Sequence, residues 1–393
     1  MYVSPMAVPE VMPVHGTVEP GFEGVRAAFE DNFAAHGDVG ASVAITIGGR
    51  MVVDLWGGTA TFDGPEDDEA GVPGVEGDWQ EDTIINVWST TKTMAALVCL
   101  MLADRGELDL YEPIATYWPE FAADGKDQIA TRHVLSHTAG LAGWDEPLEL
   151  TDYFDHDKLA RLLAAQAPWW EPGTQSGYHA DSQGYLLGEI VKRVDGRTLG
   201  TFFAEEVAGP LGADFHIGTP AECDSRIARV IPSGPIDVGR DPTSIPYRTF
   251  SNPALTAEFS WRKDWRRAEI PAAGGHGNAR SVALCHTPTA CGGTANGVTL
   301  LSEEGVARIF DVQYEGPDLN LLSTQKFGMG FGLLPGPGPY PRECYWGGWG
   351  GSLAVINLDA QMSLSYVMNR MVGGDGDVRR RNLLSAAHDA LIT

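Results

Sequence analysis

Basic residues are scarce in this chain of 393 residues, which has 27 Lys and Arg against 53 Asp and Glu and a formal net charge of −26. Proteins that bind nucleic acids neutralise phosphates with lysine and arginine, and anionic membrane surfaces attract the same side chains. We therefore expect no nucleic-acid partner and no membrane partner. An excess of negative charge is typical of a protein that stays soluble at high concentration.

Long apolar runs and an ordered cysteine pattern are also missing. No stretch approaches the roughly 18 apolar residues of a membrane span, and the opening MYVSPMAVPEVMPVHG lacks the basic and apolar regions of a signal peptide. Cys285, His286 and Cys291 lie close together, but no second pair of ligands completes a zinc site there. The cysteines are odd in number and scattered, which indicates no disulfide framework: Cys99, Cys223, Cys285, Cys291 and Cys344. We expect a reduced, cytoplasmic protein with no metal and no organic cofactor.

The G-x-S-x-G motif, which carries the nucleophile of α/β-hydrolases, is absent as well. The near match ADSQG at 180–184 lacks the first glycine, and no clear strand precedes it. His137 in LSHTAGL would need a positioned serine and acid to form a triad, which a lone histidine does not establish. The sequence therefore disfavours an α/β-hydrolase.

Strand patterns lie at both ends of the chain, and helical patterns lie between them. Apolar, β-branched runs about a turn predict hairpins at 41–58 and 352–370. We predict an α/β (α+β) protein in which 1–110 and 219–393 form an α/β domain with an antiparallel sheet from both chain ends. Helical patterns that end near Gly or Pro recur between them, so we predict a mainly helical inserted domain at 111–218.

Three further segments have local signals of different strength. The acidic stretch 61–83 is rich in Gly and Pro, which indicates a surface loop. Ser302 precedes an apolar run as a helix N-cap. The segment 219–272 is too irregular to assign.

Ser89 and Lys92 begin an apolar helix in the stretch INVWSTTKTMAALVCLMLADRGELDL, residues 85–110. An S-x-x-K string is common by chance, but the residues after Lys92 are apolar on most sides, which indicates a core helix. A buried ammonium is costly unless its pKa falls, and a lysine in that state accepts a proton from an adjacent serine. We therefore predict that Ser89 is a nucleophile and Lys92 its proton acceptor, with the helix N-terminus adding positive charge near the attacked carbonyl.

Tyr178 lies in EPGTQSGYHADSQGYLLGEIV, residues 171–191, after a Pro-Gly turn and before a helix. A lysine ammonium beside a phenol lowers the pKa of the phenol, so we expect Tyr178 to act as a base and then as an acid. The alternative is a buried packing tyrosine whose hydroxyl finds a partner.

The glycine-rich stretch CYWGGWGGSLAVINL, residues 344–358, comes just before a strand. Such an edge lets the backbone approach a ligand closely. A backbone N–H there, paired with that of Ser89, would form an oxyanion hole. Alone, the stretch favours a bulge or a tight turn.

In this order and at these separations, the three pieces resemble the serine β-lactamase and penicillin-binding-protein superfamily, and within it the class C β-lactamase-like family VIII carboxylesterases. The resemblance covers roughly residues 17–393 and includes LSHTAGL, WEPGTQSGYH, YLLGEIVKRVDGRTLGTFFAEEVAGPLG and YVMNRM. It implies a β-lactamase/DD-peptidase-like fold, with an antiparallel sheet flanked by helices and an inserted helical domain.

The resemblance also implies roles for particular residues. Ser89 matches the acylated nucleophile, Lys92 its proton acceptor, and Tyr178 the tyrosine of the Tyr-x-Asn or Tyr-Ser motif. The implied oxyanion donors are the N–H groups of Ser89 and Trp349. The implied substrate-binding residues are Trp346, Gly347 and Gly348, which stand where β-lactamases have Lys-Thr-Gly, together with Trp88 and His179.

Two departures from the β-lactamase pattern bear on the substrate. Ala180 stands where β-lactamases have asparagine, and Trp346 stands where they have a lysine that helps bind the substrate carboxylate. Both changes disfavour charged β-lactams and favour neutral esters. We expect a serine carboxylesterase for small to medium esters, as a monomer or homodimer. The alternatives at the same site are an amide hydrolase, a weak β-lactamase and an acyltransferase, which pocket shape rather than motif distinguishes.

Overall fold

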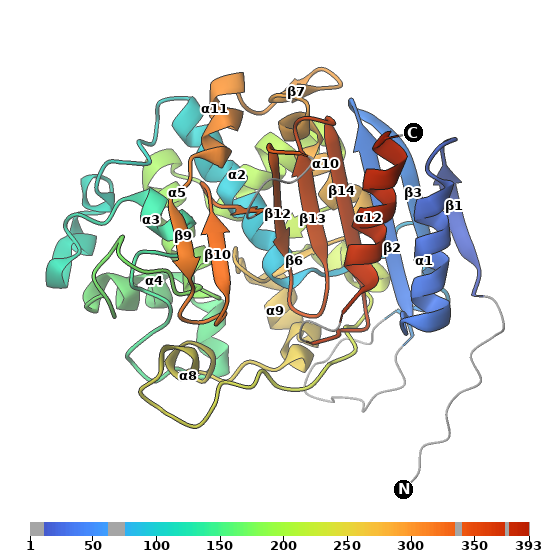
Figure 1. Cartoon of the computed structure of the whole chain (residues 1–393). Helices are drawn as coiled ribbons and strands as arrows, with labels where there is room; N and C mark the ends of the chain where they lie inside the picture. The colour runs from blue at the N-terminus through green and yellow to red at the C-terminus, as the bar shows by residue number, and fades with distance from the viewer. Residues whose placement is uncertain (1–11, 62–74, 335–339, 374–376, 393) are drawn as a thin grey trace, which may run out of the picture.

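The computed structural model describes residues 12–61, 75–334, 340–373 and 377–392, and the 61–83 loop predicted from sequence lies largely outside these ranges. Its main element is one antiparallel sheet of nine strands in the order β1-β3-β2-β14-β13-β12-β11-β10-β9 (Figure 1). The strands are β1 (Val14–Val18), β2 (Gly40–Ile47), β3 (Arg50–Gly58), β9 (Tyr314–Pro317), β10 (Thr324–Phe327), β11 (Gly332–Leu333), β12 (Glu343–Gly347), β13 (Leu353–Asn357) and β14 (Met362–Met368).

The two ends of the chain meet at the centre of this sheet. Strand β2 pairs with β14, with Val43 opposite Tyr366, and each strand also forms a hairpin with its neighbour in sequence. Almost every residue of β2 (GASVAITI) and β14 (MSLSYVM) is buried, because helices cover both faces of the sheet. Both sequences are rich in β-branched or apolar residues, which favour strands. The predicted hairpins and the sheet built from both chain ends are therefore present.

Helices pack on both faces of the sheet. Helices α1 (Glu23–Ala35) and α12 (Arg379–Ile392) lie together on one face, and α10 (Ala279–Ala290) packs against β2, β13 and β14 on the other (Figure 1). Helix α2 (Thr91–Asp104) is buried at every residue from Thr91 to Ala103, which confirms the expectation of a core helix.

The part of the chain from 111 to 211 is helical and lies beside β9 and β10 (Figure 1). Its α-helices are α3 (Thr131–Leu135), α4 (His156–Ala165), α5 (Ser182–Asp195), α6 (Leu199–Phe203) and α7 (Gly209–Leu211), and the short turns are η2 (Ile114–Thr116), η3 (Pro119–Gly125), η4 (Leu150–Phe154) and η5 (Ala204–Ala208). Helix α5 ends at Gly196, whose φ of +93° suits glycine and closes the helix where the sequence predicts. The exact domain boundaries stay a prediction.

Two small sheets and several short helices complete the described chain. One small sheet has the strand order β4 (Ile85–Asn86), β6 (Gly275–Gly277) and β5 (His216–Ile217), and its edge strand β4 comes just before Ser89 in the chain. The remaining elements are η1 (Trp88–Thr90), η6 (Ala221–Arg226), α8 (Ile245–Phe250), η7 (Ala257–Trp261), α9 (Lys263–Arg267), β7 (Thr294–Ala295), β8 (Val298–Thr299), α11 (Glu303–Ala307) and η8 (Arg308–Phe310). The Ser302 hydroxyl accepts from the Gly305 N–H, which confirms the predicted N-cap.

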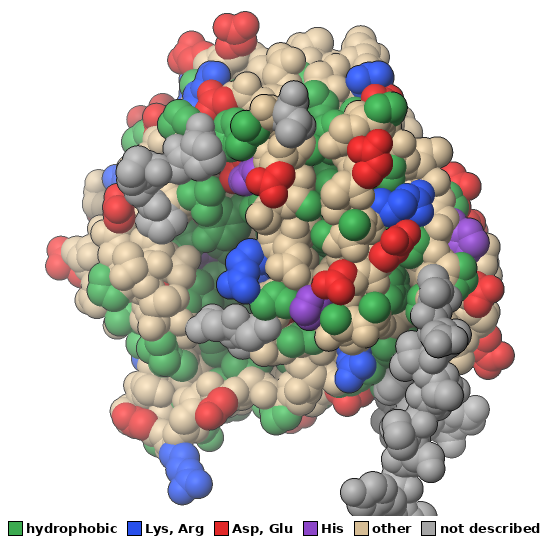
Figure 2. Space-filling view, turned by 45° about the vertical axis from the view of Figure 1, so that its right-hand side comes forward, with side chains coloured by type: hydrophobic (Ala, Val, Ile, Leu, Met, Phe, Trp, Pro, Cys, Tyr) green, Lys and Arg blue, Asp and Glu red, His purple; other side chains and the backbone are tan. Residues whose placement is uncertain are grey.

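The surface of the described chain carries many acidic side chains, which are spread over the face shown in Figure 2, and hydrophobic side chains line a hollow on that face. Among the described residues, no helix combines the length and apolar character needed to cross a bilayer.

Candidate active site

Ser89 lies in the short turn η1 between strand β4 and helix α2. The preceding Trp88 has φ +49°, a left-handed conformation that costs a non-glycine residue about 1–2 kcal/mol. Its indole is held between Trp265, with ring centroids 5.6 Å apart, and Trp349, at 5.0 Å. Ser89 itself is only partly buried, although both of its neighbours in the turn are buried. Tertiary packing thus holds a strained turn that leaves the serine accessible.

Lys92 is 2% exposed, and its Nζ contacts three oxygens: Ser89 Oγ at 3.2 Å, and the carbonyl oxygens of Ala180 at 2.5 Å and Ala272 at 2.9 Å. A lysine ammonium has three N–H donors, whereas the neutral amine has two donors and one acceptor lone pair. The ammonium can donate to all three oxygens. The amine can donate to the two carbonyls and accept from the Ser89 hydroxyl. One arrangement of heavy atoms therefore satisfies both protonation states.

Burial lowers the pKa of Lys92 to about 7, and the carboxylate of Asp181 partly opposes this shift. Burial in turn raises the pKa of Asp181, whose Oδ2 accepts from the Tyr153 hydroxyl at 3.0 Å. The amine is therefore poised to gain or lose a proton near neutral pH, where a general base is most effective.

Tyr178 completes the group, with its hydroxyl donating to Ser89 Oγ at 2.6 Å and its ring centroid 4.9 Å from Lys92 Nζ. The expectation that the phenol has a lowered pKa is wrong: burial raises the pKa of Tyr178 above its usual value, and the hydrogen bond with Ser89 opposes this only in part. The reason is that a phenolate in this buried position would lose its hydration, and the nearby Asp181 also disfavours a second negative charge. The resting tyrosine is a hydrogen-bond donor.

A buried clamp from the β9–β10 connection holds the backbone of Tyr178. The carboxylate of Asp318, which is 2% exposed, accepts from the Tyr178 N–H at 3.1 Å and from the Ser176 hydroxyl at 2.6 Å. The Asn320 amide donates to the Tyr178 carbonyl at 2.7 Å and to Thr249 Oγ1 at 3.1 Å. Both peptide groups of the tyrosine are thus fixed by side chains about 140 residues away in sequence.

The end of strand β12 approaches the serine turn very closely. An added Cβ at Gly348 would lie 2.2 Å from the Val87 carbonyl oxygen and 2.2 Å from Ser352 Oγ, so only glycine fits. The Ser352 hydroxyl donates to the Val87 carbonyl at 2.8 Å and lies 2.9 Å from Thr90 Oγ1. These contacts join the strand end to η1 on both sides of Ser89.

The N–H groups of Ser89 and Trp349 donate to no backbone carbonyl within the described ranges. Both lie beside the close approach at Gly348, as an oxyanion hole requires, and their use for that purpose remains a proposal. Gly347 is less confined, since an added Cβ would meet the flexible end of Arg380 at 2.9 Å and the Ser352 carbonyl oxygen at 3.4 Å.

Aromatic side chains pack around Tyr178. The indole of Trp346 lies 5.9 Å from the Tyr178 ring and 5.6 Å from Phe327, measured between centroids, and Phe250 and Tyr314 pack against the same cluster. Phe250 belongs to α8, so the segment left unassigned in the sequence supplies part of this wall. The site is therefore apolar on the side of Trp346, where the corresponding lysine of a β-lactamase would make it cationic.

His179 and Trp88, which were expected to contact the substrate, are both buried. His179 is fully buried; its Nδ1 lies 2.7 Å from the Gly177 carbonyl oxygen and its Nε2 accepts from the Leu141 N–H at 3.1 Å. The ring is thus unavailable to a substrate, contrary to expectation, because both of its nitrogens face backbone groups of the surrounding chain. Trp88 is 3% exposed and packs against Trp349, so it is not available to contact a substrate directly.

The two alternative motifs have structural positions. His137 Nδ1 accepts from the His179 N–H at 3.1 Å, and its ring packs against Tyr178. The buried Ser182 hydroxyl donates to the Leu141 carbonyl at 2.6 Å at the start of α5. Neither side chain hydrogen-bonds to Ser89.

A family model described as Beta-lactamase matches residues 25–388. The chain belongs to the beta-lactamase family. This confirms the resemblance found from the motifs, and the nine-stranded sheet with helices on both faces is the fold that the family implies. Among curated relatives of this beta-lactamase family member, "Esterase/beta-lactamase LipL" of Mycobacterium tuberculosis is 33% identical over 91% of this chain and 83% of its own length.

Solved structures of related proteins include a family VIII carboxylesterase, which is 39% identical, has a TM-score of 0.87 and covers 96% of this chain and 100% of its own. Another is EstA from Arthrobacter nitroguajacolicus Rue61a, at 29% identity and a TM-score of 0.82, covering 96% of this chain and 98% of its own.

Proposed function

We propose that this beta-lactamase family member is a serine carboxylesterase that acts through an acyl-enzyme on Ser89. The observation that carries the proposal is the contact of one serine oxygen with both the buried Lys92 amine, at 3.2 Å, and the Tyr178 hydroxyl, at 2.6 Å. Relatives with esterase in their names, at 33% and 39% identity, support ester hydrolysis as the reaction.

Acylation begins with neutral Lys92. Ser89 Oγ attacks the ester carbonyl carbon while its proton moves to Lys92 Nζ, which remains hydrogen-bonded to the Ala180 and Ala272 carbonyls. The carbonyl oxygen becomes an oxyanion that the Ser89 and Trp349 N–H groups stabilise. No heavy atom of the lysine has to move, because the same three oxygens satisfy the ammonium.

Collapse of the tetrahedral intermediate breaks the ester C–O bond. The departing alkoxide takes the Tyr178 hydroxyl proton, and the phenolate regains a proton from the Lys92 ammonium. Water then attacks the acyl carbon along the same relay in reverse, which frees the carboxylic acid and restores Ser89. The raised pKa of Tyr178 suits this role, since a phenolate formed here is quickly reprotonated.

The preferred substrate is a neutral ester. Trp346 packs with Tyr178, Phe327 and Phe250 where a β-lactamase lysine would bind a carboxylate, so an anionic substrate would lose solvation without gaining an ion pair. A weak β-lactamase activity is the second candidate, because the name of the M. tuberculosis relative includes both esterase and beta-lactamase. We expect hydrolysis of nitrocefin, a charged β-lactam, to be slow beside that of a neutral p-nitrophenyl ester.

Labelling with a fluorophosphonate tests the nucleophile. Mass spectrometry of the digested adduct is expected to place the label on Ser89, and Ser89→Ala is expected to lose both labelling and p-nitrophenyl ester hydrolysis, with an unchanged melting temperature. The exposed Ser233 provides the matched control, so Ser233→Ala should keep both. Ester hydrolysis by Ser89→Ala within a few-fold of the parent, or a label on another serine, would overturn the proposal.

A further inference from the structure

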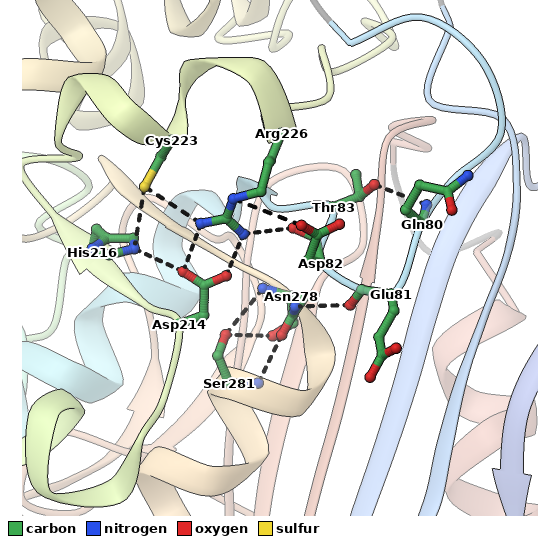
Figure 3. Close-up of polar contacts among 10 residues, drawn as sticks. All are labelled: Gln80, Glu81, Asp82, Thr83, Asp214, His216, Cys223, Arg226, Asn278 and Ser281. Carbon is green, nitrogen blue, oxygen red and sulfur yellow. Dashed lines mark hydrogen bonds and ion pairs between the residues drawn. The ribbon is translucent and has the colours of Figure 1, made fainter.

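Asp214, His216 and Cys223 point toward one another (Figure 3), beside strand β5, which forms the edge of the small sheet opposite β4. Asp214 and His216 lie before and on β5, and Cys223 lies on η6. His216 Nε2 is 2.9 Å from Asp214 Oδ1 and 3.7 Å from Cys223 Sγ, and the three ligand atoms all lie within 4.8 Å of one another.

The two separations that involve His216 are close to the edges of a metal tetrahedron. Zinc binds histidine nitrogen, carboxylate oxygen and thiolate sulfur at about 2.0–2.3 Å, which places neighbouring ligands roughly 3.3–3.8 Å apart. The separations of 2.9 and 3.7 Å from His216 Nε2 need shifts of only a few tenths of an ångström, and the ligand atoms of Asp214 and Cys223 lie within 4.8 Å of each other. The mixed ligand set of one carboxylate, one imidazole and one thiol favours zinc over magnesium or calcium, which prefer oxygen ligands alone.

We propose that Asp214, His216 and Cys223 form a zinc-binding site, with water as the fourth ligand. Binding converts the Cys223 thiol to a thiolate and releases its proton to solvent, while His216 binds through Nε2 as the neutral imidazole and Asp214 through Oδ1. The site is separate from Ser89 and forms no part of the proposed ester hydrolysis.

The guanidinium of Arg226 already shows that this position attracts positive charge. It contacts Asp214 through Nη1 at 2.5 Å and Nη2 at 3.2 Å, and Cys223 Sγ through Nη2 at 3.5 Å (Figure 3). Zinc must therefore displace it from Asp214. Arg226 has a second partner ready, because it also donates to the Asp82 carbonyl at 2.7 Å and its Nε lies 4.0 Å from the Asp82 carboxylate.

The ligands are accessible enough for exchange. The side chains of His216 and Asp214 are 25% and 33% exposed, whereas Cys223 is buried behind them.

The position of the site gives it a structural effect. His216 faces His276 across β5 and β6, and His276 faces Asn86 across β6 and β4, three residues before Ser89. Arg226 directly precedes Ile227, and Ile227 forms a bridge with Ile84, the residue just before β4. Zinc would link β5 to η6, close to the segment that leads to Ser89. Because the three ligands come together only in the folded chain, zinc would stabilise the fold by mass action.

Cobalt(II) titration of the reduced, chelator-treated protein tests the site, because a thiolate ligand gives a charge-transfer band that histidine and carboxylate ligands do not. We expect a 1:1 complex with tetrahedral d–d bands and the thiolate band, reversed by zinc. Cys223→Ser should lose the thiolate band. Cys291→Ser, which changes a cysteine away from the cluster, should keep it.

A second variant guards against loss of the fold in Cys223→Ser. Arg226→Gln removes the competing cation and should tighten cobalt binding roughly tenfold, as expected for a lost charge-assisted hydrogen bond. Zinc should also raise the melting temperature of the parent protein while leaving kcat for esters within two-fold. Absence of the thiolate band in the parent, its survival in Cys223→Ser, or weaker binding by Arg226→Gln would each overturn the site, whatever happens to ester hydrolysis.

Discussion

Replacing Gly348 by alanine should separate the oxyanion hole from the rest of the site. The new Cβ would lie 2.2 Å from both the Val87 carbonyl oxygen and Ser352 Oγ, so the end of β12 would have to move away from η1 by more than about 1 Å to reach an ordinary contact distance. Removing one oxyanion donor costs about 10²–10³ in kcat, and a 1 Å misplacement about 10². We expect kcat for p-nitrophenyl esters to fall about 100- to 1000-fold, with a smaller change in KM.

The neighbouring glycine supplies the control. A Cβ at Gly347 would meet Arg380 Nη1 at 2.9 Å, which is the free end of a flexible side chain, and the Ser352 carbonyl oxygen at 3.4 Å. Gly347→Ala should therefore stay within about five-fold of the parent in kcat, since only a rim contact shifts. Steady-state kinetics and thermal melting of the two variants make the comparison. Equal losses in both variants, or a Gly348→Ala enzyme with nearly parental kcat, would refute the assignment of Trp349 as an oxyanion donor.

Three other predictions concern the relay. Burial lowers the pKa of Lys92 to about 7 and the neutral amine is the proposed base, so kcat/KM should rise with pH through an apparent pKa near 7. Lys92→Arg, which stays charged, should lose about 10²–10⁴ in kcat, and a pH-independent profile would argue against the lysine base. Asp181 raises the pKa of Lys92, so Asp181→Asn should move the acid limb of the pH profile to lower pH, and a shift to higher pH would contradict this sign. Asp318→Asn weakens the hold on the Tyr178 backbone and should lower kcat about ten-fold with little change in KM, whereas the nearby exposed Ser323→Ala should change neither, so an effect confined to KM would speak against a positioning role.

Local patterns predicted the serine, the lysine and the main hairpins because each depends on residues close in sequence. Ser89 and Lys92 are one helical turn apart, and the apolar run behind them required burial of the amine. The two central hairpins follow from β-branched runs about a turn. Burial of Lys92 could thus be inferred before any partner was known.

The partners of these residues could not be predicted in the same way. Ala272 contributes only a backbone carbonyl, which has no signature in a sequence, and Asp318 meets Tyr178 across 140 residues. The raised pKa of Tyr178 could not be predicted, because it depends on how completely the folded chain buries the phenol. The position of His179 could not be predicted, because being next to Tyr178 in sequence does not determine on which side of the backbone a ring lies.

The central pairing of β2 with β14 means that the reaction centre does not exist until the last hundred residues have been placed. Its atoms come from the turn at 88–92, the segment 178–181, Ala272, the clamp at 318–320 and the strand end at 346–352. A nascent chain that still lacks β12 to β14 already contains Ser89 and Lys92, but it lacks the strands that complete the site around them. Recovery of esterase turnover during renaturation should therefore lag behind helix formation, and turnover itself becomes a stringent reporter that both ends of the polypeptide have met.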